Sequence, residues 1–129
     1  MKVEIEIVGL RELEDKLSNL EDKLNRALAE ALEEIAEKIR DDAKNLAPVD
    51  TGALRKSIRV EKEGKLQFSV VAGGGGVVNP KTGREVDYAI FLEVGTRRMS
   101  PQPYMQPALE RNRAEILRIV KDKVLKVFR

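Results

Sequence analysis

The chain has 129 residues, a formal net charge of +2, and neither cysteine nor histidine. This length suits one domain with a modest core, and the missing cysteine excludes disulfides and thiolate chemistry. Charged residues make up 36% and hydrophobic residues 42%, which predicts a folded protein with a heavily charged surface. The opening MKVEIEIVGL lacks a signal-peptide pattern, and no apolar run reaches the roughly 20 residues of a bilayer span. We therefore expect a soluble protein, made in a cytosol, with no membrane contact.

The first predicted elements are a strand and a long helix. Apolar and charged residues alternate from Lys2 to Val8, as in a half-buried strand. From Leu10 to Leu46, leucine and isoleucine then recur every three or four residues, and LEDKLSN is followed directly by LEDKLNR. Pro48 ends this pattern. We predict one long amphipathic helix over residues 10–46, and a break near residues 18–19 is the conservative alternative.

Residues 57–96 are predicted to be rich in strands. The segment before them, PVDTGALRKSI, contains Asp50 or Thr51 as a cap for a short turn and Gly52 as its flexible position. Alternating residues on both sides of Glu63-Gly64 predict a hairpin over Ser57–Ala72. Residues 73–83 contain GGGG and NPKTG, so we predict a long loop or flap there, with Val77–Val78 as an additional strand segment.

Two further elements complete the chain. VDYAIFLEVGT predicts a buried helical turn or short strand that ends at Gly95. Its apolar residues are Tyr88, Ile90, Phe91, Leu92 and Val94. A C-terminal helix is predicted over residues 107–129, with Pro107 at its first position. The expected fold class is α+β, a single domain in which a small antiparallel sheet is packed on one face by the long N-terminal helix and the C-terminal helix.

Residue chemistry gives little support to catalysis. Without His or Cys, the usual bases, soft nucleophiles and metal ligands are missing. Paired carboxylates such as Asp41 and Asp42 lie on a predicted helix surface, and no calcium-loop spacing occurs. The glycine run is not followed by the Lys-Ser/Thr of a phosphate-binding loop. We expect no enzyme activity, no cofactor and no metal.

Charge is divided unevenly along the chain. Residues 10–46 carry 7 basic and 11 acidic side chains, whereas residues 47–129 carry 16 and 9. This division suits head-to-tail contact between copies, although two solvated faces would give the same counts. The C-terminal helix carries 7 basic and 3 acidic residues, so a basic nucleic-acid-binding module that uses this helix is the alternative function. No recognition motif accompanies it.

Three ordered motifs resemble a known family. APVDTGALRKSI, YAIFLEVGT and SPQPYMQPALE follow the long Leu-rich segment in this order. The resemblance depends on Asp50, Thr51, Gly52, Leu54, Tyr88, Glu93, Gly95, Thr96, Pro103, Pro107, Ala108 and Leu109. In them the chain resembles the tail-component (head–tail joining or tail-completion) family of long-tailed bacteriophages.

The resemblance implies a non-catalytic structural protein of the virion neck. Such a subunit is made in the host bacterial cytoplasm and assembles into a ring, hexameric by analogy with the family. Its implied partners are other copies of itself and other phage tail or connector proteins, with DNA in passage. The family supplies no active site, so the candidate site residues rest on chemistry alone.

The stretch GTRRMSPQPYMQP predicts a stiff contact surface. Three prolines reduce conformational freedom before binding, and Tyr and Met supply adaptable contact area. Arg97 and Arg98 can meet carboxylates of a neighbouring copy or phosphates of DNA. The predicted interface comprises Glu93, Thr96, Arg97, Arg98, Met99, Pro101, Pro103, Tyr104 and Met105. An alternative remains open in which Tyr104 and Met105 cap the core beneath the last helix.

Overall fold

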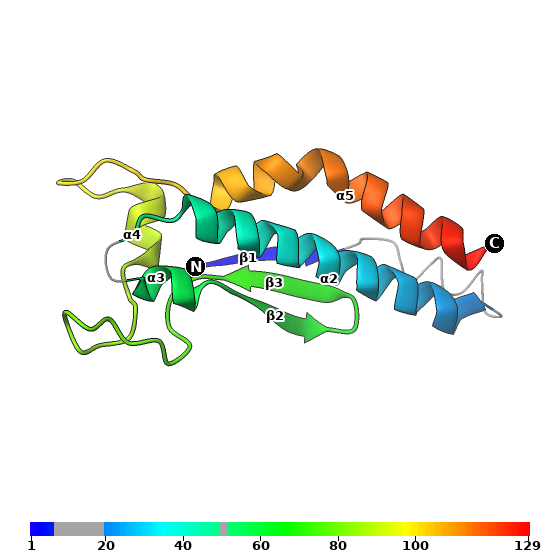
Figure 1. The fold of residues 1–129 in the computed structure, drawn as a ribbon, viewed down its shortest axis with the longest axis horizontal. Helices are drawn as coiled ribbons and strands as arrows, with labels where there is room; N and C mark the ends of the chain where they lie inside the picture. Colours follow the sequence, from blue (N-terminus) through cyan, green and yellow to red (C-terminus); the bar gives the residue numbers. More distant parts are fainter. Residues whose placement is uncertain (7–19, 50–51) are drawn as a thin grey trace.

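Two long helices and a three-stranded sheet form most of the computed structural model, which describes residues 1–6, 20–49 and 52–129 (Figure 1). In chain order the elements are β1 (Lys2–Glu6), α2 (Glu21–Leu46), α3 (Ala53–Ser57), β2 (Arg59–Gly64), β3 (Gln67–Val71), α4 (Ala89–Val94) and α5 (Met105–Val127). This arrangement confirms the predicted α+β class.

The sheet is antiparallel, with β3 between β1 and β2. Val70 lies opposite Val3 on one side and Val60 on the other, and these side chains face the core. Since side chains alternate along a strand, Ser69 and its neighbour Glu4 face the other way. One face of the sheet is therefore apolar and the other polar.

The long helix α2 lies between the sheet and α5. It contacts all three strands, and α5 packs chiefly along α2. The apolar residues repeated along α2 fill the core, among them Leu32, Ile35 and Ile39. Polar contacts also join the helices: for example, Lys38 and Glu115 form an ion pair of 3.0 Å, and the Asn112 amide donates a 2.7 Å hydrogen bond to Asp42. The two helices run antiparallel, so the start of α2 lies near the end of α5 (Figure 1).

Several predicted boundaries change. The N-terminal strand is described over Lys2–Glu6, and residues 10–19 of the predicted long helix lie outside the described residues, as do Asp50 and Thr51. Val77–Val78 do not join the sheet, because Val78 forms an isolated bridge with Glu85 instead. The last helix begins at Met105, before Pro107, and it rests mainly on α2 rather than directly on the sheet.

The predicted flap at residues 73–83 folds into a narrow ribbon. Val86 donates a backbone hydrogen bond to Val77, and Asn79 donates one to Arg84. The ribbon projects at the same end of the molecule as α4 and the loop that follows it (Figure 1). The candidate site lies on two of these segments, α4 and the loop that follows it.

Candidate interaction surface at the Arg97–Arg98 turn

The loop between α4 and α5 is closed at its base by Tyr104. This side chain is 0% exposed, and its hydroxyl donates a 2.9 Å hydrogen bond to the Ala89 carbonyl at the start of α4. Burial, with a smaller contribution from the nearby Glu93 carboxylate, raises the pKa of Tyr104. The Gln102 amide also donates to the Leu92 carbonyl at 2.7 Å. The end of the loop that enters α5 is therefore held back against α4, from which the loop starts.

Glu93 of α4 caps α5. Its carboxylate accepts hydrogen bonds from the backbone amides of Tyr104 (2.7 Å), Met105 (3.2 Å) and Gln106 (2.7 Å). The next residue, Pro107, has no N–H to satisfy, and Ala108 begins the regular helical bonding by donating to Tyr104. Glu93 thus satisfies the free amides at the helix start and places a negative charge at the positive end of the helix dipole.

The tip of the loop is a tight turn from Thr96 to Met99. The Thr96 amide donates to Met99 at 2.9 Å, the Met99 amide donates back at 3.4 Å, and the Arg98 amide donates to the Thr96 hydroxyl at 3.3 Å. Gly95 begins the turn with φ +79°, and a Cβ there would lie 2.9 Å from the Met99 carbonyl oxygen and from the Pro101 ring. Glycine is therefore required at this position.

The turn exposes two arginines without partners. Arg97 and Arg98 are both exposed, and neither side chain has a hydrogen bond or ion pair in the described part of the chain. Beside them, α4 presents an apolar side to solvent: Ile90 is 42% exposed, Phe91 51% and Val94 61%. We name this set (Ile90, Phe91, Val94, Arg97 and Arg98) the turn surface. Exposed apolar residues next to unpaired arginines are a composition typical of protein interfaces.

Comparison with family models decides the chain's membership. Residues 11–95 match the family described as "Bacteriophage HK97-gp10, putative tail-component". The chain belongs to this family. No curated protein and no solved structure matches it. As a member of a phage tail-component family, the protein is a viral structural component of the virion tail, and its partners are other phage proteins.

The HK97-gp10-like match includes only part of the turn surface. It covers α4 and ends at Gly95, so the Arg97–Arg98 turn and α5 lie beyond it. The match includes Glu93, the residue that closes the loop on α5. Of the motif residues within the match, Gly52 precedes α3, Leu54 is buried in the core and Tyr88 packs against the core at the start of α4.

The predicted interface residues divide into three groups. Thr96, Arg97, Arg98, Pro101 and Pro103 are exposed, and Met99 is partly exposed. Glu93 is occupied by the cap of α5. Tyr104 and Met105 are buried in the subunit's own core, as in the alternative that the sequence left open, because they form the start of α5 and pack in the core cluster there. They act as anchors of the loop within one subunit.

The sequence analysis was wrong about the burial of α4. It predicted an apolar segment that is buried as a whole, but only Ala89 of α4 is fully buried, and Ile90, Phe91 and Val94 face solvent. Glu93 and Leu92 face the loop and α5 instead. A helical spacing signal was present, since positions 90, 91 and 94 share one side of a helix. The sequence could not show that no other described element of the subunit packs against this side of α4.

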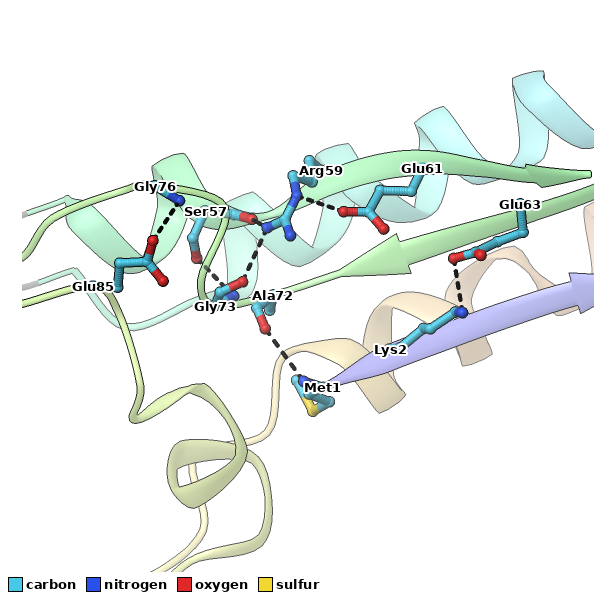
Figure 2. A network of polar contacts seen from close by, with 10 residues as sticks. All are labelled: Met1, Lys2, Ser57, Arg59, Glu61, Glu63, Ala72, Gly73, Gly76 and Glu85. Atoms are coloured by element: carbon cyan, nitrogen blue, oxygen red, sulfur yellow. Dashed lines mark hydrogen bonds and ion pairs between the residues drawn. The ribbon is translucent and has the colours of Figure 1, made fainter.

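A second feature that sequence reasoning missed is the Arg59 network near the same end (Figure 2). Arg59 Nη1 donates to the carbonyls of Ser57 (2.8 Å) and Gly73 (3.0 Å), and Nε donates to Glu61 (2.9 Å). A Cβ on Gly75, where φ is +67°, would lie 2.8 Å from the Arg59 guanidinium carbon. The glycine run therefore lets the backbone pass directly over this arginine, which attaches the ribbon to the sheet.

Neither a metal cluster nor a membrane span is found in the described residues. Residues 1–6, 20–49 and 52–129 contain no group of three or more acidic side chains placed to hold a metal ion. Within the same ranges no helix combines the length and the apolar character that a bilayer crossing requires.

Proposed function

We propose that this tail component is a non-catalytic subunit of the virion neck, which joins or completes the tail by assembling into a ring. The observation that carries the proposal is the turn surface, a hydrogen-bonded turn whose two arginines have no side-chain partner among the described residues, beside three exposed apolar side chains. The loop is ordered within the subunit, so a partner that binds it does not bear the entropic cost of ordering it.

The charge of α2 supports contact between copies. Glu33 and Glu37 are exposed, lie one helical turn apart, and have no partner among the described residues. Two arginines on one copy and two carboxylates on its neighbour would form charge-assisted hydrogen bonds, with the apolar side of α4 buried alongside. The ring is proposed to be hexameric by family analogy, and connector or other tail proteins are its further partners.

The test is a charge reversal at the turn. The variant Arg97→Glu/Arg98→Glu should fold normally, because both side chains are exposed, but it should fail to form rings and fail to complete tails. Multi-angle light scattering across protein concentration and salt measures assembly, which we expect to weaken as salt rises. Complementation of a phage that lacks the gene measures tail completion.

A matched control reverses the charge of two cations elsewhere on the subunit. Arg111→Glu/Lys121→Glu changes two exposed cations of α5 that have no partner in the described chain. This control should assemble and complement like the wild type. Full complementation by the Arg97/Arg98 variant, or a wild type that stays monomeric and does not bind tails, would contradict the proposal. The alternative function, a nucleic-acid-binding module that uses the C-terminal helix, predicts the opposite order, in which the α5 variant is the more impaired.

A further inference from the structure

A groove lies at the opposite end of the molecule from the turn surface. It is formed by the first turns of α2 and the last turns of α5, which Figure 1 shows side by side near the C-terminus, and its volume is about 570 Å³. Five cations line it together with one carboxylate, Glu30. We call it the basic groove, and its cations are Lys23, Arg26, Lys123, Lys126 and Arg129.

Among the described residues, only one of these cations has an acidic partner. Lys123 has Glu30 and Glu34 at 3.9 Å each. In the part of the chain that the structure describes, the other four have neither an ion pair nor a hydrogen bond. The side chains that line the groove, five cations and Glu30, sum to a formal charge of +4. A cleft of one charge sign concentrates field and attracts counter-ions.

Some of these cations suit the dipole of their own helix, and others do not. Lys126 lies in the last turn of α5, where a cation stabilises the helix dipole. Lys23 lies in the first turn of α2, where a cation is unfavourable for the same reason. Because α2 and α5 run antiparallel, packing brings these two positions together. The like charges that meet in the groove repel each other, and binding of an anion would relieve this repulsion.

The lining also indicates which anion fits. Its only apolar residues are Ala27 and Val127, and none of its described residues is aromatic. Protein interfaces place aromatic or aliphatic anchors at their centre and are poor in lysine. Single-stranded nucleic acid is normally held by base stacking on aromatic side chains. The phosphate backbone of a duplex requires neither, since Lys and Arg point charges suffice.

We propose that the basic groove binds the phosphate backbone of duplex DNA without sequence preference. This site goes beyond the proposed role in tail assembly, because it uses different residues at the other end of the subunit. Fluorescence anisotropy with a short duplex of arbitrary sequence, over a series of salt concentrations, measures the binding. We expect a dissociation constant of about 10⁻⁴–10⁻⁶ M near physiological salt and a log–log salt slope of roughly −4, for four or five phosphate contacts.

The decisive variant is Lys23→Gln/Arg26→Gln/Lys126→Gln. It should keep the wild-type circular-dichroism spectrum, lose affinity at least ~10-fold, and move the salt slope toward zero by about 2.7, or roughly 0.9 per lost contact. The matched control Arg84→Gln/Arg111→Gln/Lys121→Gln removes the same charge from exposed positions outside both the groove and the turn surface. Its affinity should stay within about twofold of wild type, because it retains all the groove cations.

Four results would overturn this inference. The first is no measurable duplex binding at low salt, and the second is an equal loss of duplex affinity in the two triple variants. The other two are tighter binding of single-stranded DNA than of duplex, and tighter binding of polyglutamate than of duplex. The last would point to an acidic protein partner. Ring formation and complementation are measured separately with the Arg97/Arg98 variant, so failure of the groove leaves the assembly proposal intact.

Discussion

Glu93 accepts a 2.7 Å hydrogen bond from the backbone amide of Tyr104, eleven positions further along the chain. This contact closes the loop that carries Arg97 and Arg98. The Tyr104 hydroxyl returns to α4 at Ala89, so the two residues hold the loop base from both sides. The backbone of the turn is therefore ordered on folding, before any partner binds.

Removing the cap should destabilise the subunit. Glu93→Ala leaves three backbone amides at the start of α5 without their acceptor, and we expect a loss of about 2 kcal/mol in the free energy of unfolding. Urea denaturation measures this loss, and hydrogen exchange should show faster exchange at Tyr104 and Gln106. Glu33→Ala, at an exposed carboxylate without a partner in the described chain, should change stability by less than about 0.5 kcal/mol. Equal effects of the two changes would argue against the cap.

The two tyrosines offer a matched comparison. Tyr104→Phe removes the hydroxyl that donates to Ala89 and should cost about 1 kcal/mol of unfolding free energy. The Tyr88 hydroxyl has no hydrogen bond within the described residues, so Tyr88→Phe should be nearly neutral. Thermal unfolding of both variants tests this prediction, and a larger loss in Tyr88→Phe would contradict it.

The glycine run allows a test of the close contact between the Gly75 backbone and the Arg59 guanidinium. Gly75→Ala combines a positive φ with a clash against Arg59, whereas Gly76→Ala has a positive φ and open space. We expect Gly76→Ala to cost about 1 kcal/mol and Gly75→Ala about 1–2 kcal/mol more. In an Arg59→Ala background the difference between the two should disappear. If it persists at full size in urea denaturation, the guanidinium is not its cause.

Acid should weaken the junction between α2 and α5. The hydrogen-bonded ion pair with Lys38 lowers the pKa of Glu115 from its ordinary value of 4.5. A folded-state pKa below the unfolded one means that the stabilisation is present at neutral pH and is lost as pH falls from 4.5 through the folded value. Glu115→Gln should therefore be less stable than wild type at neutral pH, and the two should converge in acid. A difference in urea midpoint that is unchanged at low pH would exclude this ion pair as the cause.

Local patterns in the sequence were sufficient for the main elements. The alternation in Lys2–Glu6, the recurring apolar positions of α2 and the stop at Pro48 each depend on residues close together in the chain. Such patterns report the period of the backbone, so they specify strand or helix and the side that prefers burial. With the three ordered motifs, they were enough for the α+β class and the tail-component family.

Only the tertiary structure decided which of the apolar sides predicted from the sequence are in fact buried. Tyr104 and Phe91 are both aromatic residues in apolar segments, yet the first is buried in the core and the second is 51% exposed in the described part of the chain. Glu93 was predicted at a contact between copies, but the return of the chain places three amides of its own subunit against it. Lys23 and Lys126 meet in one groove only because α2 and α5 pack antiparallel. Burial and charge clustering depend on neighbours that are distant in sequence, and only the packing of whole elements supplies them.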